Sequence, residues 1–443
     1  MTELMDYDEA ARRFDPVLGI EVHVELGTKT KMFDAAPNAF GGDPNTFVTP
    51  VSLGLPGSLP VVNRKAVEYA IKIGLALNCE IAQYCRFARK NYFYPDLTKA
   101  FQTSQSDEPI AHDGYVDVEL EDGTMFRVDI ERAHMEEDAG KNTHIGGADG
   151  RIQGADHSLV DYNRAGVPLV EIVTRPIEGA GERAPEVAAA YVQALRDIFR
   201  ALGVSEARME RGNVRADINV SLRPTPDSPL GTRTETKNVN SFRGIASAVR
   251  YEMQRQAQIL SEGGTILQET RHYHEEDGST SSGREKSDSE DYRYFPEPDL
   301  PPLELSEAYI QALRASQPEL AAAKRARYQA VWGLGSYDAE MLTSQKALAR
   351  FFEETVALGV EPKQAANWLM GPVLAQLSAH GLEARDMALT PPTLARLIQL
   401  VKEGRLNRNT AVRVCEAVFE TDGDVDAYVA AHGLAQVSDA GLV

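Results

Sequence analysis

Residues 19–26 read GIEVHVEL and alternate strictly between apolar and polar side chains. Because successive side chains of a strand point to opposite faces, Glu21, His23 and Glu25 share one face and the apolar residues share the other. An edge strand with one hydrated face commonly shows the same alternation. Carboxylates beside an imidazole can also bind Mg²⁺ or transfer protons. The stretch therefore predicts either a hydrated strand face or a reactive site.

A second acidic cluster, HMEEDAGK at 134–141, follows a strand that the pattern predicts to end at Glu131. A surface turn would also explain its adjacent acids. Glu171 is harder to explain, because it lies inside the apolar stretch PLVEIVT at 168–174. An unpaired carboxylate there would cost several kcal/mol, so we expect Glu171 to have a cation nearby.

Two further strands, at 214–222 and 232–238, carry more polar residues than a core would tolerate. We predict that acidic residues from several strands share one pocket. So many carboxylates require a bound cation, and oxygen-rich sets of this kind bind Mg²⁺. The predicted metal-site residues are Glu21, His23, Glu136, Glu171, Asp217 and Glu235.

The segment RKNYFYPDLTKAFQTSQ at 89–105 combines basic and aromatic residues. It could simply bury its aromatic rings and leave Lys90 and Lys99 hydrated. The same charges and rings also suit a polyphosphate or an RNA end. The chain has no GxxxxGK[ST] or GxGxxG motif, so a nucleotide must bind by another route. We assign cofactor binding to Arg89, Arg233 and Lys237.

Composition restricts the class of protein. A chain of 443 residues predicts two or three domains, and its net charge of -20 argues against binding nucleic acid with the whole surface. The three cysteines, with no Cys-x-x-Cys pair, indicate a reducing compartment and hence the cytosol. No apolar run is long enough for a membrane span, and the first residues do not resemble a signal peptide.

Hydrophobic periodicity predicts an α+β protein with a mostly antiparallel sheet, because few segments follow a βαβ rhythm. Helices at 63–77 and 185–202 would cover this sheet, and residues 305–435 would be helical almost throughout. The further predicted strands are 115–120 and 125–131. The predicted C-terminal helices are 306–316, 319–333, 336–359, 362–381, 391–403 and 408–419.

The chain resembles a known family in the order of its motifs over about residues 17–440. These are GIEVHVELGTKTKMF, LGLPGSLPVVN, RKNYFYPDLTK, HMEEDAGK, DYNRAGVPLVEIVTRP, TRTETKNVNS and DYRYFPEPDLPP. They are similar to the motifs of the B subunits of the aspartyl/glutamyl-tRNA amidotransferases. The resemblance implies a cradle domain at 1–300, a helical domain at 301–435 and the truncated start of a tail domain at 436–443.

The resemblance also implies a reaction. The chain would use ATP and Mg²⁺ to phosphorylate the side-chain carboxylate of Glu-tRNA(Gln) or Asp-tRNA(Asn). Ammonia from an amidase, the A subunit, would then displace phosphate, with the small C subunit wrapping both larger ones. By matching motifs, Glu21, His23 and Glu136 belong to the Mg²⁺ site, with Glu171, Glu235 and Asp217 as further candidates. Lys90, Tyr92 and Lys99 would lie at the mouth of an ammonia channel.

The chain departs from the family pattern at two places, and two alternative functions were also considered. The chain has TPVS at 49–52 where many relatives have Cys-x-x-Cys, so we expect no zinc. Its end, near the expected junction with the tail domain, predicts weaker tRNA binding. The alternative functions are those of a non-catalytic tRNA-binding scaffold and of a free-standing Mg²⁺-dependent ligase for a small acid.

Overall fold

The computed structural model describes residues 4–105, 107–146, 154–285 and 292–435. The chain forms two compact units, Met1–Gln317 and Pro318–Val443. This division lies further along the chain than the predicted boundary after residue 300, and helix α5 (Glu307–Ala315) belongs to the first unit. The predicted start of a tail domain at 436–443 lies outside the described residues.

The first unit is built on a nine-stranded sheet within the described residues, with the order β14-β13-β12-β11-β1-β10-β7-β6-β2. All neighbouring strands are antiparallel except β12 and β13. The strands are β1 (Asp15–Glu25), β2 (Glu80–Ile81), β6 (Ala111–Glu119), β7 (Met125–Glu137), β10 (Pro168–Thr174), β11 (Val214–Arg223), β12 (Thr234–Val239), β13 (Glu269–Tyr273) and β14 (Thr280–Glu285). The predicted α+β fold with a mainly antiparallel sheet is confirmed.

The described part of this unit also contains three small sheets. Strands β15 (Phe295–Pro296), β4 (Ala88–Asn91) and β5 (Phe101–Ser104) form the first of them. Strands β16 (Leu303–Glu304) and β3 (Tyr84–Cys85) form the second, and β8 (Lys141–Ile145) and β9 (His157–Asp161) form the third.

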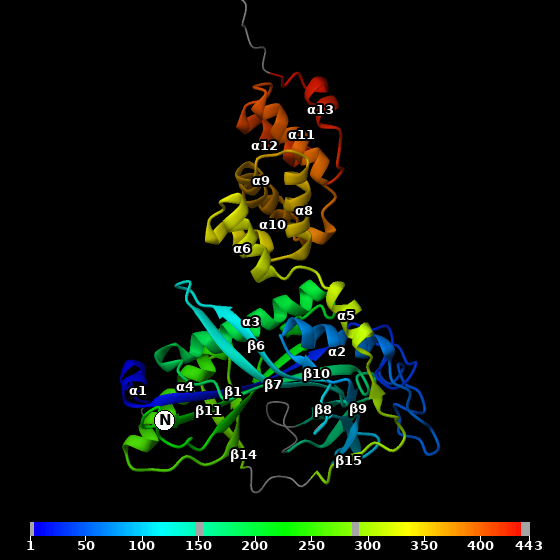
Figure 1. Ribbon diagram of the computed structural model, residues 1–443, viewed down its shortest axis with the longest axis vertical. Coiled ribbons are helices and arrows are strands. Elements are labelled where there is room, and N and C mark those ends of the chain that lie inside the picture. The colour runs from blue at the N-terminus through cyan, green and yellow to red at the C-terminus, as the bar shows by residue number, and fades with distance from the viewer. Residues whose placement is uncertain (1–3, 106, 147–153, 286–291, 436–443) are drawn as a thin grey trace, which may run out of the picture. The chain divides into compact units, whose positions relative to one another are not determined.

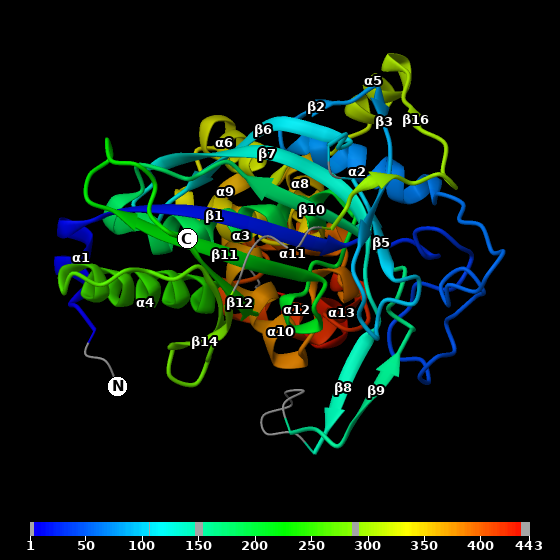
Figure 2. The same cartoon turned by 90° about the horizontal axis from the view of Figure 1, so that it is seen from below.

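Helices cover one face of the large sheet, as Figures 1 and 2 show. These are α2 (Arg64–Ala76), α3 (Ala184–Leu202) and α4 (Phe242–Ser261), and α1 (Tyr7–Arg13) packs beside α4. The apolar face of β1 faces this layer, so Ile20, Val22 and Val24 are buried. Burial of this face fixes the register, because a slip of one residue would turn every polar side chain of β1 into the core. The polar residues of β1 therefore lie on the opposite face.

Strand β7 is longer than the sequence pattern predicts. The prediction that the strand ends at Glu131 is wrong, since β7 continues to Glu137 and pairs with β10 through Glu136 and Glu137. The acids of HMEEDAGK therefore begin within the sheet rather than on a surface turn. The β6–β7 ladder reaches only Ala133, so the pairing with β10, which sequence alone does not reveal, is what extends the strand through these residues.

A buried ion network attaches strands β12, β13 and β14 to helix α4. The carboxylate of Glu252 is fully buried and lies 2.8 Å from Nε of Arg271 and 2.7 Å from Nη2 of Arg255. It also accepts a 2.8 Å hydrogen bond from the hydroxyl of Thr234. Burial opposes ionisation of Glu252, but the hydrogen bond from Arg255, the charges of Arg255 and Arg271 and the hydrogen bond from Thr280 lower its pKa. The network therefore positions the strand that carries Glu235.

We expect Glu252→Ala to destabilise the first unit, because it leaves the nearly buried guanidinium of Arg271 without one of its carboxylates. Breaking a buried ion pair costs about 3–5 kcal/mol, which corresponds to a fall of roughly 5 °C or more in thermal midpoint. Differential scanning calorimetry would measure this fall. Glu276→Ala, an exposed position between β13 and β14, is the matched control. Equal midpoints for the two variants would contradict the assigned role.

The second unit is helical, as predicted, and has its own core around Tyr328, Phe352 and Trp368. Its helices are α6 (Ala321–Trp332), α7 (Ser336–Thr343), α8 (Lys346–Ala357), α9 (Pro362–Trp368), α10 (Leu374–His380), α11 (Pro391–Lys402), α12 (Arg408–Val418) and α13 (Val425–Ala431).

Two of the predicted helices in this unit are not continuous. The helix predicted at 336–359 is divided into α7 and α8, because Gln345 has an extended backbone and its side chain accepts a hydrogen bond from the amide of Ala384. The helix predicted at 362–381 contains a π-helical turn at Leu369–Val373. Pro372 lies in this turn and has no N–H to donate, which favours the irregularity.

Candidate metal and phosphoryl-transfer site

One group of possible metal ligands comes from three neighbouring strands. His23 lies opposite Glu171 in the β1–β10 ladder. Glu136 on β7 pairs with Leu169, which lies two residues before Glu171 and on the same face of β10. The Nε2 atom of His23 lies 3.5 Å from Glu136 Oε1 and 3.6 Å from Glu171 Oε2. One ligand atom from each of the three residues lies within 4.8 Å of the others. We call this the histidine group.

Burial and charge act together in the histidine group. Burial opposes protonation of His23, but its hydrogen bond to Glu171 and the charges of Glu171 and Glu136 raise its pKa to about 9. Burial and the charge of Glu171 raise the pKa of Glu136. Hydrogen bonds from His134 and His23 outweigh burial at Glu171 and lower its pKa. Two carboxylates with limited hydration thus favour a positive charge beside them, which a protonated His23 or a bound metal ion would supply.

A second group contains Glu21, Asp217 and Glu235, whose ligand atoms also lie within 4.8 Å of one another. Glu21 pairs with Asp217 across β1 and β11, and Glu235 pairs with Asn219 across β12 and β11. The ammonium of Lys237 lies 3.0 Å from Asp217 and 3.5 Å from Glu235. We call these three acids and Lys237 the lysine group. A cation is therefore already present at this position.

The six residues predicted to share one pocket thus form two groups of three possible ligands on the polar face of the sheet. The six residues occupy five adjacent strands, from β12 to β7. At about 4.8 Å between strands these span roughly 19 Å, too far for one ion to contact all six. The structure brings every predicted acid to the same face but divides the possible ligands between the two groups.

His134 is a site residue that the sequence analysis missed. It pairs with Glu171 across β7 and β10, is almost fully buried, and its Nε2 lies 3.1 Å from Glu171 Oε2 and 3.9 Å from Glu136 Oε2. Its Nδ1 has no hydrogen-bond partner among the described residues. His134 and Glu136 are two residues apart, the spacing that places both side chains on one face of a strand. The sequence analysis missed this because it ended the strand at Glu131.

Lys90 and Tyr92 lie at the border of the histidine group. The charge of Lys90 counteracts the burial-induced rise in the pKa of Glu136. Tyr92 has a raised pKa, chiefly because of burial and the nearby charges of Asp96 and Glu136. The ammonium of Lys90 lies 4.8 Å from the ring centre of Tyr292. Both predicted residues are therefore close to the predicted metal ligands.

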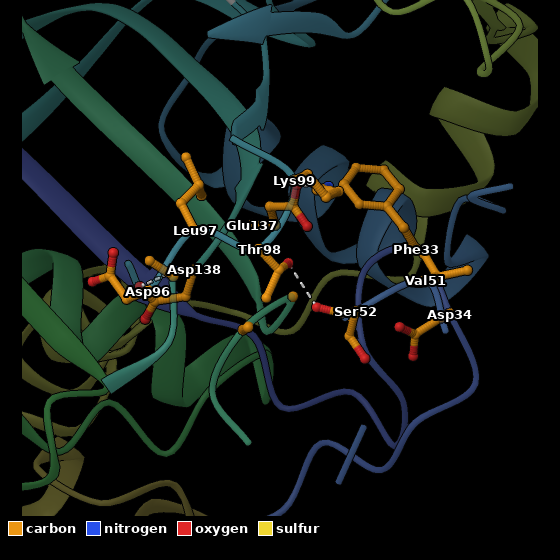
Figure 3. Close-up of a pocket in the computed structure, with 13 residues that line it drawn as sticks. Phe33, Asp34, Val51, Ser52, Asp96, Leu97, Thr98, Lys99, Glu137 and Asp138 are labelled. Atoms are coloured by element: carbon orange, nitrogen blue, oxygen red, sulfur yellow. Dashed lines mark hydrogen bonds and ion pairs between the residues drawn. The ribbon is translucent and has the colours of Figure 1, made fainter. Parts of the chain in front are cut away.

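Lys99 lies in a pocket beside these residues, drawn in Figure 3. Its ammonium forms an ion pair with Glu137, whose carboxylate also accepts a 3.0 Å hydrogen bond from the backbone N–H of Thr103. The hydroxyl of Thr98 donates a 2.8 Å hydrogen bond to the carbonyl of Ser52 in the same wall. A lysine and a buried carboxylate thus face one cavity, which suits proton transfer.

Two of the three residues predicted to bind cofactor lie outside both groups. The guanidinium of Arg89 makes two 2.8 Å hydrogen bonds to Glu297 and a 3.2 Å hydrogen bond to Asp299. This pairing joins β4 to the segment after β15, so Arg89 has a structural role whether or not it also binds a cofactor. Arg233 is exposed directly before β12. Lys237 alone belongs to one of the groups.

Comparison with known proteins identifies the family. Residues 16–311 match the GatB/GatE catalytic domain, and residues 350–443 match the GatB domain. The chain belongs to the GatB family. The B subunit of the aspartyl/glutamyl-tRNA(Asn/Gln) amidotransferase of Corynebacterium diphtheriae is 58% identical over 443 residues, which cover 100% of this chain and 88% of the relative. The protein of the same name from Paenarthrobacter aurescens is 57% identical over 437 residues, 99% of this chain and 87% of the relative.

Membership of the GatB family confirms the resemblance and the predicted enzyme class, one subunit of an aminoacyl-tRNA amidotransferase. The catalytic-domain match covers both the histidine group and the lysine group. Among the described residues, no helix combines the length and apolar character that crossing a membrane requires.

Proposed function

We propose that this GatB-family chain uses ATP and Mg²⁺ to phosphorylate the side-chain carboxylate of Glu-tRNA(Gln), Asp-tRNA(Asn) or both, so that ammonia can convert it to an amide. The observation that carries the proposal is the convergence of His23, Glu136 and Glu171 in a buried part of the catalytic domain. The names of the relatives describe an amidotransferase for these tRNAs. Such a reaction takes place in the cytoplasm, where translation uses charged tRNA.

The reaction has two steps. A carboxylate oxygen of the aminoacyl group bonds to the γ-phosphorus of ATP, and the bond between that phosphorus and the bridging oxygen of ADP breaks. Ammonia then bonds to the carbonyl carbon and phosphate leaves with the electrons of its bond, while the surplus proton of nitrogen passes to a base. Activation is needed because oxide is a very poor leaving group and phosphate is a good one.

The donor set of the histidine group fits Mg²⁺, because carboxylate oxygens are its preferred ligands and their excess charge calls for a cation. Bound there, the ion would neutralise charge on the transferring phosphoryl group. His23, Glu136 and Glu171 would hold it. His134 orients Glu171 through its 3.1 Å contact, and such supporting contacts strengthen metal binding. Lys237 in the lysine group would add a fixed positive charge for phosphate oxygens.

The proposed protein partners are the amidase (the A subunit), which releases ammonia from glutamine, and the small C subunit. We refer to the assembly of this chain with both partners as the three-subunit complex. Ammonia would reach the acyl phosphate past Lys99, Tyr92 and Lys90. The ion pair of Lys99 with Glu137 provides an acid and a base in one cavity, as proton removal from ammonium requires.

The proposal predicts that ATP hydrolysis depends on charged tRNA. For the three-subunit complex, we expect Glu-tRNA(Gln) or Asp-tRNA(Asn) to raise the ADP release rate at least about tenfold over uncharged tRNA, since only the charged form has the acceptor carboxylate. Coupled assays of ADP release would measure this. Stimulation by free glutamate or aspartate would favour a small-acid ligase, and the absence of any ATP turnover would favour a scaffold.

A further inference from the structure

Three tyrosines form a connected group beside the histidine group. The rings of Tyr92 and Tyr292 are 6.1 Å apart at 70°, and those of Tyr292 and Tyr294 are 5.9 Å apart at 70°. We call Tyr92, Tyr292 and Tyr294 the tyrosine group. These edge-to-face contacts hold the rings in fixed mutual orientations. The sequence analysis related Tyr92 to an ammonia channel but gave no role to Tyr292 or Tyr294.

The backbone between the last two rings has an uncommon conformation. Arg293 has a φ of 46°, in the left-handed region that residues other than glycine seldom adopt. The side-chain amide of Asn91 donates hydrogen bonds of 3.2 Å to the carbonyl of Tyr292 and 2.9 Å to that of Arg293. The backbone N–H of Asn91 also donates to the carbonyl of Tyr292, at 3.0 Å. Asn91 therefore keeps this turn in the conformation that presents Tyr292 and Tyr294.

The tyrosine group lies on the side of the sheet where the carboxylates converge. Strand β15 follows Tyr294 directly and pairs with β4, and Figure 1 shows β15 below the large sheet, opposite helices α2 and α3. Strand β4 pairs with β5, and the side-chain amide of Gln102 on β5 donates a 2.8 Å hydrogen bond to the carbonyl of Glu137, the residue after Glu136. In agreement with this position, burial and the charges of Glu171 and Glu136 raise the pKa of Tyr294 to about 12. Tyr294 is nevertheless 44% exposed. An exposed ring beside a phosphoryl-transfer site is available for stacking.

We propose that Tyr294, supported by Tyr292, binds an adenine ring by stacking, an inference that rests on the proposed function. Adenine is present in both substrates, in ATP and in the 3′-terminal adenosine of tRNA, and either must bring its reacting group to the histidine group. Stacking on an aromatic ring suits a nucleobase because every base has an apolar face. The ammonium of Lys90, 4.8 Å from the ring centre of Tyr292, adds positive charge for the adjoining phosphates.

Direct binding experiments test this proposal without relying on turnover. The three-subunit complex would be titrated with ATP in Mg²⁺ and, separately, with a short RNA duplex ending in single-stranded CCA. We expect Tyr294→Ala to weaken binding of one of these ligands about tenfold, and Tyr294→Phe, which keeps the ring, to change it less than about twofold. Tyr337→Ala, at an exposed tyrosine of the second unit, is the matched control.

The outcomes separate the two sources of adenine. Weaker ATP binding alone assigns the ring to the nucleotide, and weaker binding of the CCA duplex alone assigns it to the tRNA end. Unchanged binding of both ligands, an equal loss of both, or an equal loss with Tyr294→Phe would overturn the proposal. If the binding effects occur but the complex phosphorylates no charged tRNA, the proposed function fails while the adenine site stands.

Discussion

His23→Ala and Glu136→Gln should each reduce phosphorylation of the aminoacyl carboxylate by about 100-fold or more, while the partner amidase continues to hydrolyse glutamine. Glu136→Gln keeps the shape of the side chain but removes its negative charge from a buried position. His23 contacts both acids of its group, at 3.5 Å from Glu136 and 3.6 Å from Glu171. Loss of charge-stabilising groups in a preorganised site commonly costs this much in rate.

The measurement is formation of ADP and of acyl phosphate, trapped with hydroxylamine, with glutamate release from glutamine assayed in parallel. His112→Ala is the matched control for His23, since His112 is partly exposed and pairs with Asp113 away from the site. Wild-type phosphorylation by either site variant would refute the assignment of the histidine group. A parallel loss of glutaminase activity would instead show that the variants disturb the complex.

The fold of the first unit was largely predictable because its strands alternate strongly. Burying Ile20, Val22 and Val24 on one face forces Glu21 and His23 onto the other, so the polar face follows from β1 alone. Strand order does not follow from this local pattern. That β1 lies between β10 and β11 depends on pairings between residues more than 100 positions apart, and the place of β7 beyond β10 depends on a further non-local pairing.

The site was less predictable because it depends on register. Alternation places His23 on a polar face, and the apolar neighbours of Glu171 predict a cation near it, but only the ladder places the two residues opposite each other. The division of the six predicted residues into a histidine group and a lysine group reflects strand spacing, which no single segment encodes. His134 was missed because the acids after it favoured a turn, whereas pairing with β10 extends the strand.

For the basic residues, the sequence did not predict which carboxylates they contact. Charge and aromatic neighbours favoured phosphate binding for Arg89, yet its guanidinium is held by Glu297 and Asp299, about two hundred positions later in the chain. Lys237, on the polar strand β12, is likewise held by protein carboxylates, those of Asp217 and Glu235, but these belong to the lysine group. A basic side chain in sequence therefore predicts a negatively charged partner, but tertiary structure decides whether that partner is protein or ligand.

Lys99→Met should separate the two sources of nitrogen. If Lys99 and Glu137 transfer the proton of ammonium, amidation supplied by glutamine will fall at least about tenfold, because ammonia delivered from the partner must pass this pair. Amidation supplied by a high concentration of free ammonium, which enters from solvent, will largely persist. The measurement is amide formation on charged tRNA with each nitrogen source, at saturating ATP.

Removing the ammonium also leaves the carboxylate of Glu137, only 5% exposed, without its ion-pair partner. Lys99→Met combined with Glu137→Gln removes both charges and so avoids that burial penalty. Lys29→Met, at an exposed lysine, controls for the loss of one positive charge. If the double variant regains stability but not glutamine-supported activity, the pair acts on ammonia. Equal losses with glutamine and with ammonium would instead assign Lys99 to phosphate binding, because the acyl phosphate is needed whatever the nitrogen source.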